Sequence, residues 1–333
     1  MSSAAEGEFR SPGHPLLLRL LRVVGIAVLT LFLASIVVFA VLRFVPGDPA
    51  TVLAGADADD DTIAAIRAQL GLDRPVPAQY LHWIGALVTG DLGRAYVVGG
   101  DIAGLVGHAL ANTLVLAVGA LVVALVITAV LSLAVVLFPR PWLVALVNGF
   151  QALSIAVPTF VTGVVLVSVF AVAVRLLPAG GTPPRGYLDD LSITAQYLIL
   201  PSICLGLPVA SALTRFLTEA LRTELAEPYV TTARAAGVPE RRIVLNGALR
   251  NALPPTVTVL GLQIGGLLGS AVLVEAIFAW PGLGQLLVQA INARDYPLVQ
   301  VLLLLSVAVF IVTATLTELA QTLLDPAARA GVS

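Results

Sequence analysis

The sequence predicts an all-α integral membrane protein with six transmembrane helices and with both termini on the cytoplasmic side. Of its 333 residues, 58% are hydrophobic and 11% are charged, and the mean hydropathy is +0.98. Soluble domains carry about 25% charged residues, far more than this chain. The apolar residues are gathered in blocks of about twenty or more, which is long enough to cross a bilayer as a helix. A soluble helical core is disfavoured because its buried helices seldom reach that length.

The first apolar run, residues 23–42, is predicted to be the first span. Twenty helical residues cover about 30 Å, which is the thickness of one bilayer core. The run follows the polar segment 1–22, which contains Arg19 and Arg22. It is too long for the apolar part of a signal peptide, and no small-residue cleavage site follows it. We therefore expect a retained span with a cytoplasmic N-terminal segment.

Residues 43–111 are predicted to be an external segment. An acidic cluster around Asp59 precedes a helical pattern at Thr62–Leu70, where the acids suit the helix dipole and Gly71 ends the helix. A second amphipathic piece is predicted at Gln79–Val88. Because Gly and Pro interrupt the segment, we expect a compact cap on the membrane helices and no independent domain.

Five further apolar runs complete the predicted bundle. The third span is long enough to tilt or to break near Pro158, and the fourth is predicted to be interrupted by Pro201 and Pro208. These spans are predicted at 112–137, 143–174, 196–217, 256–276 and 298–323. The other segments are external loops at 175–195 and 277–297, a polar cytoplasmic loop at 218–255 and a cytoplasmic tail at 324–333.

Arginine is distributed unevenly between the two sides of this bundle. With the N-terminus inside, eleven arginines fall in short cytoplasmic segments and seven in the longer external ones, where acids outnumber them. Short cytoplasmic segments of membrane proteins carry the excess of basic residues. The distribution therefore predicts that both termini are cytoplasmic.

Residue types needed for several kinds of chemistry are missing. All eighteen basic residues are arginine, which excludes a P-loop because that motif places a lysine on the nucleotide phosphates. Cys204 is the single cysteine, and His14, His82 and His108 are too scattered for a metal or general-base cluster. We predict no catalytic residue, no metal, no cofactor and no nucleic-acid partner for this chain.

The most polar internal stretch is 219–255, which contains five of the eighteen arginines between two apolar runs. It cannot lie in hydrocarbon and must project into water. The first predicted helix in it is Thr218–Ala226, supported by a pair between Arg215 and Glu219. A last helix is predicted to begin at Pro239 and to end before Pro254.

Between these two, a helix is predicted at Tyr229–Ala236, ending at Gly237 as a left-handed stop. Its side chains are mostly small, and small side chains let a partner approach closely. The stretch is either a docking surface or a solvated connection between spans. A long loop with helices of its own is usually functional, so docking is favoured.

Two motifs in this stretch resemble a known family. The first reads Tyr229-Val230-x-x-Ala233-Arg234-Ala235-x-Gly237, and the second reads Ala248-Leu249-Arg250-Asn251-Ala252-Leu253-x-Pro255. Together they resemble the cytoplasmic signature of ABC importer permeases, most closely that of the dipeptide, oligopeptide and nickel branch. Thr231 and Arg250 stand where the general pattern has Glu and Pro, and both departures suit the peptide branch.

Further motifs along the chain are similar to the same family and occur in the family's order. They most resemble the first permease subunit of the peptide-importer pair, which has the larger external segment. These motifs are Pro46-Gly47-Asp48-Pro49, Leu70-Gly71-Leu72-Asp73-Arg74-Pro75, Gly90-Asp91-Leu92-Gly93, Trp280-Pro281-Gly282-Leu283-Gly284, Arg294-Asp295-Tyr296-Pro297 and Leu324-Asp325-Pro326.

The resemblance implies a type I ABC importer permease fold in a bacterial plasma (inner) membrane. It implies that this chain forms half of a path for dipeptides or oligopeptides and couples to a separate ATPase through the 219–255 loop. The implied partners are a second permease subunit, two ATP-binding subunits that hold ATP and Mg, and an external substrate-binding protein. Nickel, glutathione and haem are alternative cargoes. A self-sufficient secondary transporter is an alternative of another class, which the absence of paired inverted repeats disfavours.

The resemblance and the residue types together define candidate sites. The ATPase-coupling residues implied by the family are Tyr229, Thr231, Thr232, Ala233, Arg234, Ala235, Ala236, Gly237, Arg250 and Asn251. Candidate path-lining residues are Gln151, Ser154, Gln263 and Glu275. Candidate contacts for the binding protein are Asp91, Trp280, Pro281, Gly282, Arg294 and Asp295. Glu275 either meets a peptide ammonium or pairs with an arginine such as Arg175, because an acid at the end of a span is costly without a partner.

Overall fold

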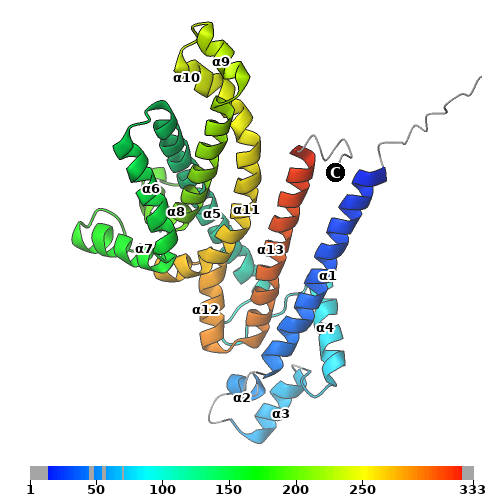
Figure 1. Cartoon of the computed structure of the whole chain (residues 1–333). Coiled ribbons are helices and arrows are strands. Elements are labelled where there is room, and N and C mark those ends of the chain that lie inside the picture. Colours follow the sequence, from blue (N-terminus) through cyan, green and yellow to red (C-terminus); the bar gives the residue numbers. More distant parts are fainter. Residues whose placement is uncertain (1–13, 45–48, 55–57, 70, 325–333) are drawn as a thin grey trace, which may run out of the picture.

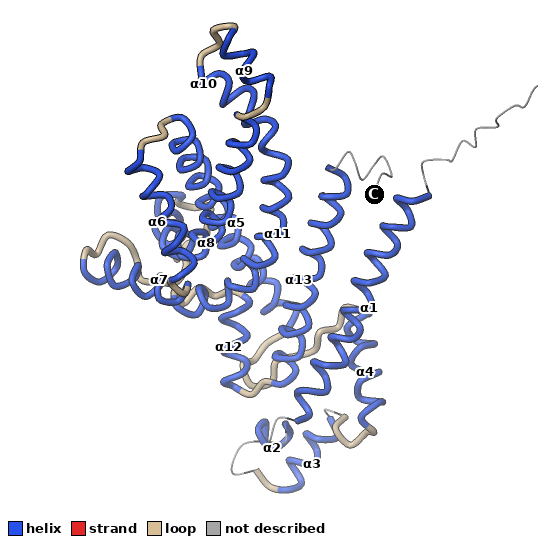
Figure 2. Tube along the Cα trace, viewed as in Figure 1, coloured by secondary structure: helices blue, strands red, loops and turns tan. Residues whose placement is uncertain are grey.

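The computed structural model describes residues 14–44, 49–54, 58–69 and 71–324 of the chain. The predicted N-terminal and C-terminal segments and the Pro46-Gly47-Asp48 motif therefore lie largely outside the described residues. Within the described residues the chain is helical and contains no β-strand. The all-helical membrane class is thus confirmed, and Figures 1 and 2 show the arrangement.

The helices before the first long loop are one span and three short pieces. They are α1 (His14–Phe44), α2 (Pro49–Ala54), α3 (Asp60–Gln69) and α4 (Val76–Val88). The middle of the chain forms α5 (Ile102–Leu137), α6 (Pro141–Ala156), α7 (Thr159–Leu166), the π-helical η1 (Val167–Ala173) and α8 (Leu191–Leu225). The last part forms α9 (Pro228–Ala235), α10 (Glu240–Arg242), η2 (Ile243–Ala248), α11 (Leu249–Ile277), α12 (Leu283–Ala293) and α13 (Tyr296–Leu324).

Four helices are long and apolar enough to cross a membrane, and two bent helix pairs bring the number of candidate spans to six among the described residues. The four unbroken spans lie in α1, α5, α8 and α13. The helix of the second span begins at Ile102 and not at Asn112, so part of the predicted external segment is helical continuation.

The predicted third span, 143–174, is not one straight helix. The chain bends by 109° between Pro141–Ala156 and Thr159–Ala173. Val157 is extended, with φ −95° and ψ 119°, because the residue before a proline is pushed away from the helical region. Pro158 is the N-cap of the next helix, which begins at Thr159, so its missing N–H costs no hydrogen bond within that helix. The break near Pro158 therefore follows from the restriction that this proline places on the backbone of Val157.

The predicted interruption of the fourth span is wrong, because α8 runs as one helix through both Pro201 and Pro208. Asp190 caps it: its Oδ1 accepts hydrogen bonds from the Ser192 amide at 2.9 Å and the Ile193 amide at 3.2 Å. The hydroxyl of Ser192 also donates to this oxygen, and these bonds lower the pKa of Asp190. The helix α8 continues to Leu225, so the separate helix predicted at Thr218–Ala226 is wrong; that segment is the last part of the span.

The core of the bundle is the packing of α8 against α5 and α11. Leu116 and Ala120 of α5, Leu205 and Leu213 of α8, and Val274 of α11 are all buried in one cluster. Gly206 allows the close approach of α5 and α8: a Cβ there would lie 2.6 Å from the carbonyl oxygen of Ala120. The backbones of α5 and α8 thus contact each other directly at Gly206, as is typical of helices packed in membranes.

We predict that Gly206→Ala destabilises the bundle by about 1–3 kcal/mol, because the added methyl must push a backbone oxygen away. Gly107→Ala is the matched control, since a Cβ at this exposed position in α5 meets nothing within 4 Å. The control is expected to be neutral or to stabilise by up to about 1 kcal/mol. Unfolding of the purified protein in detergent by titration with dodecyl sulfate measures both. Equal stability of the two variants would contradict the close contact.

The two ends of the molecule differ in what they carry. Figure 1 shows α9 and α10 at the end where α1 begins and α13 finishes, whereas α2, α3 and the loop after α12 lie at the opposite end. The polar loop and the chain ends described thus share one side, as the arginine distribution predicts. We refer to the side of α9 as the cytoplasmic end and to the other as the external end.

Candidate functional site

The helix α9 is the centre of the predicted coupling loop. It spans Pro228–Ala235, with Pro228 at its first position. Two amides that follow the helix donate hydrogen bonds back to carbonyls of its last turn. The amide of Gly237 donates to the Arg234 carbonyl and the amide of Val238 donates to the Ala233 carbonyl, both at 3.0 Å. Gly237 has φ +77°, so the predicted left-handed stop is confirmed. This pattern is the Schellman motif, which satisfies the last carbonyls of a helix.

Most of α9 faces solvent. Val230 is its one fully buried residue among those described, with 0% exposure, and Ala233 is half-buried. The predicted coupling residues that are exposed on or beside the helix are Tyr229, Thr231, Thr232, Arg234, Ala235, Ala236 and Gly237. A single buried side chain holds a short helix weakly, so the anchoring of α9 has to come from polar contacts.

Glu224 supplies that anchoring, and the sequence reasoning missed it. One oxygen of this side chain, Oε2, accepts hydrogen bonds from the Tyr229 hydroxyl and from the Asn251 side-chain amide, both at 3.0 Å. Glu224 lies at the end of α8, Tyr229 on α9 and Asn251 on α11. The carboxylate therefore joins three helices at one point. Asn251 lies 27 residues further along the chain, so no local pattern signals the contact.

Arg234 of α9 forms an ion pair with Glu240 of α10. Its Nη2 lies 2.6 Å from Oε1 and its Nε 3.1 Å from Oε2, the two-pronged geometry that arginine favours with carboxylates. The hydrogen bond lowers the pKa of Glu240 and raises the pKa of Arg234. Arg241 lies over the Phe138 ring at 5.8 Å, which ties the loop to the end of α5. The pair is exposed, so its contribution is small and sensitive to salt.

Two details of the predicted loop are wrong. The helix that begins after Pro239 does not end before Pro254; it continues through η2 into α11, with Pro254 and Pro255 inside it. The wider π-type turn at 243–248 precedes these prolines, and such turns let a helix continue across a local misfit. Glu219 pairs with Arg222 at 3.9 Å and not with Arg215.

At the external end, Glu275 is the buried centre of a hydrogen-bond network. It is 0% exposed. Its Oε1 accepts from the Thr113 hydroxyl at 2.6 Å, and its Oε2 accepts from the amides of Gly284 at 2.6 Å and Gln285 at 3.2 Å. The carboxyl group thus lies at the N-terminus of α12, where helix N–H groups lack partners of their own.

Glu275 is therefore enclosed by hydrogen-bond donors of this chain and is not paired with Arg175, and its role as a path residue stays a prediction. The turn after it packs tightly on the side chain. A Cβ at Gly282 would lie 2.2 Å from Oε1 of Glu275, and one at Gly284 would lie 2.4 Å from the Cα of Val272. The helix α12 (Leu283–Ala293) was not predicted, because the sequence indicated only an external loop at 277–297.

Two of the predicted binding-protein contacts, Trp280 and Asp295, are buried as well. Trp280 is 0% exposed, and its Nε1 donates to the Asn112 carbonyl at 2.9 Å. Asp295 is 1% exposed, and its Oδ2 accepts from the amides of Val97 at 2.7 Å and Val98 at 3.0 Å. Trp280 thus ties the loop after α11 to α5, and Asp295 ties the external segment to the turn before α13. Their role as contacts for the binding protein stays a prediction.

Gly282 is buried as well, whereas Pro281, Arg294 and Asp91 are exposed at the external end. Close to Trp280, the Tyr187 hydroxyl donates to Oδ1 of Asn112 at 2.7 Å. Burial raises the pKa of Tyr187 to about 12, so this phenol stays a donor at neutral pH. The external loop 175–195 is thereby fixed to α5.

The remaining path candidates do not form a site that the structure defines. Gln151 and Ser154 lie half-buried on α6, and Gln263 lies half-buried on α11. Their role stays a prediction. The part of the chain that the structure describes holds no group of three or more His, Cys, Asp or Glu side chains suited to a metal ion.

Comparison with known proteins gives a consistent result over most of the chain. Residues 124–330 match the family model described as "Binding-protein-dependent transport system inner membrane component", and residues 16–113 match the N-terminal model of the same transport systems. The chain is 37% identical to the glutathione transport system permease protein GsiC of Escherichia coli (strain K12) over 300 residues, which cover 90% of this chain and 95% of that protein. The GsiC proteins of Shigella flexneri serotype 5b and Salmonella typhimurium are 37% and 36% identical, with the same coverage.

Proposed function

We propose that this chain imports small peptides of the glutathione class. It belongs to the family of binding-protein-dependent transport system inner membrane components and is a multi-pass permease subunit of a bacterial ABC importer. Glutathione is itself a short peptide, so the names of the relatives and the peptide-branch motifs of the coupling loop favour the same cargo chemistry. Nickel and haem are the other cargoes that the same architecture would serve.

We propose that α9 is the coupling helix of the importer. The observation that supports this most directly is its exposed face of small side chains, held at a fixed place by Glu224. A partner can approach such a face closely, and a force on α9 reaches both α8 and α11 through one carboxylate. Movement of the docked partner would then rock these spans between inward-facing and outward-facing states.

The energy for this cycle is proposed to come from other chains. Two ATP-binding subunits would hold ATP and Mg, a second permease subunit would complete the path, and an external binding protein would deliver the cargo. Arg250, exposed beside Asn251, and the outward face of α9 would meet the ATP-binding subunits. The exposed residues Asp91, Pro281 and Arg294 are the proposed contacts for the binding protein.

Uptake into reconstituted vesicles tests the proposal. The chain is inserted with its second permease and ATP-binding subunits, and the binding protein with labelled glutathione is added outside. We expect uptake that requires ATP inside the vesicles and each of the partner subunits. Uptake by this chain alone, driven by an ion gradient, would refute the importer mechanism and support a secondary transporter. ATP-dependent uptake of nickel or haem without peptide uptake would refute the cargo.

A further inference from the structure

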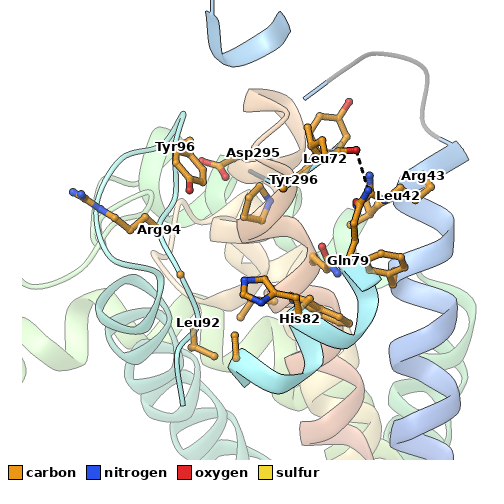
Figure 3. Close-up of a pocket in the computed structure, with 18 of the residues that line it drawn as sticks. Leu42, Arg43, Leu72, Gln79, His82, Leu92, Arg94, Tyr96, Asp295 and Tyr296 are labelled. Atoms are coloured by element: carbon orange, nitrogen blue, oxygen red, sulfur yellow. Dashed lines mark hydrogen bonds between the residues drawn. The ribbon is translucent and has the colours of Figure 1, made fainter. Parts of the chain in front are cut away.

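The external end contains a cavity with a volume of 530 Å³ that is separate from the buried Glu275 network. It lies between the end of α1, the helix α4 with the loop after it, and the turn that leads into α13. Its volume falls in the range of about 300–1,000 Å³ that is usual for sites of small molecules. Figure 3 shows Gln79 and Arg43 on one side of the cavity and Tyr96 with Asp295 on the other.

The wall of the cavity is rich in arginine. Its four arginines are Arg43, Arg74, Arg94 and Arg294, and its two acids are Asp91 and Asp295. None of these arginines pairs with a carboxylate among the described residues. Arg43 donates to Oε1 of Gln79 and lies over the Phe39 ring at 5.0 Å, which leaves most of its N–H groups without an acceptor. The guanidinium of Arg94 extends away from the other labelled side chains (Figure 3).

The two acids of the wall accept hydrogen bonds from backbone amides and form no ion pair with these arginines among the described residues. Asp91 accepts from the Gly93 amide at 2.9 Å, and Asp295 accepts from the two amides described above. The wall also contains two buried polar atoms without a hydrogen-bond partner, the Tyr296 hydroxyl and Nε2 of Gln300. Both can donate. The cavity therefore carries more positive than negative charge, and it contains hydrogen-bond donors without partners.

The position of the cavity indicates the source of an anionic group that would bind there. Leu42 and Arg43 belong to the last turn of the candidate span Leu21–Phe44, which places the cavity at the depth of lipid headgroups. Beside it, the side chains of Val41 and Phe44 on α1 are 51% and 85% exposed, a surface suited to acyl chains. Arginine binds phosphate through two parallel hydrogen bonds, and basic pockets between membrane helices bind anionic headgroups.

We propose that this cavity binds the phosphate group of an anionic phospholipid headgroup from the external leaflet. The lipid would neutralise the arginines and join α1 to the external segment and to α13. The proposal does not depend on the cargo or on the coupling helix, so it can fail without affecting either.

The test uses the assembled importer in nanodiscs of phosphatidylcholine with added phosphatidylglycerol, with bound lipid counted by native mass spectrometry. The double substitution Arg74→Gln with Arg294→Gln removes two exposed charges from the wall. We expect the affinity for the tightest phosphatidylglycerol to fall about tenfold or more, because hydrogen bonds between a guanidinium and a phosphate are among the strongest that a protein makes. The matched control, Arg175→Gln with Arg185→Gln, removes two exposed external arginines away from the cavity and should retain the lipid.

Other outcomes would overturn the proposal. Equal loss of lipid in both double variants would mean a general charge effect. Displacement of the lipid by millimolar inorganic phosphate would assign the cavity to a free anion. Weaker capture of the binding protein with unchanged lipid binding would assign it to protein docking. Should the cavity variant not assemble, a titration of the unaltered importer decides the question: one phosphatidylglycerol that persists at low lipid supports the site, and its absence overturns it.

Discussion

Uptake falls about tenfold or more when Gly237 is replaced by valine, although the protein still inserts in the membrane. Gly237 has φ +77° and closes α9 through the hydrogen bonds of its own amide and of the Val238 amide. A β-branched residue is disfavoured in this conformation by about 1–2 kcal/mol or more, and 1.4 kcal/mol corresponds to tenfold in an equilibrium. Since α9 has one fully buried residue, it has little other stability to lose. Vesicle uptake and ATPase stimulation measure the effect.

Two further substitutions separate backbone strain from a general loss of structure. Gly237→Asn is the matched control, because asparagine tolerates the left-handed conformation, and it should retain most of the uptake. Ala233→Glu adds a charged side chain to a half-buried position of α9 and should abolish uptake without changing membrane insertion. Normal transport and normal ATPase stimulation in both Gly237→Val and Ala233→Glu would refute the docking role of this helix.

Replacement of Glu275 by alanine is expected to lower the free energy of unfolding by about 3 kcal/mol or more. The side chain is fully buried and accepts three hydrogen bonds, from Thr113, Gly284 and Gln285. Each buried donor left without a partner costs about 1–3 kcal/mol, and the lost volume adds a cavity. Unfolding in detergent by dodecyl sulfate, followed by circular dichroism, measures the change.

Glu275→Gln should be less harmful than Glu275→Ala. The glutamine oxygen can accept from the two amides, and the Thr113 hydroxyl can accept from the new NH₂ group. Glu219→Ala is the surface control, with a side chain that is 73% exposed, and it should change stability by less than about 0.5 kcal/mol. If the alanine and glutamine variants were both as stable as the unaltered protein, Glu275 would not organise the external end.

The parts of this fold that sequence could predict are those set by local composition or by one backbone conformation. The spans follow from apolar blocks, which cannot satisfy their backbone in lipid unless they are helical. The helix at 229–236 follows from Pro228 before it and Gly237 after it, and the structure places α9 at Pro228–Ala235. The weakness near Pro158 follows from the restriction that a proline puts on the residue before it.

The parts that could not be predicted depend on contacts between distant residues. The acceptor role of Glu275 requires Thr113, which lies 162 residues earlier in the chain. Trp280 and Asp295 suggested exposed contacts because they lie in a Gly/Pro-containing loop, yet Trp280 is buried against Asn112 and Asp295 against the segment at 97–98. The continuation of α11 through Pro254 and Pro255 was missed because local rules treat paired prolines as a stop.

The helix α8 runs without a break from the external loop at 175–195 to the cytoplasmic loop that holds α9. Its 35 residues extend over about 50 Å, well beyond the thickness of a bilayer core. Asp190 holds its external start, and Glu224 connects its cytoplasmic end to α9. If binding at each end favours the same position of α8, the two binding sites are linked by one coupling free energy. Such a coupling is reciprocal. Whatever factor a cytoplasmic partner imposes on binding at the external end, an external partner must therefore impose on docking at α9.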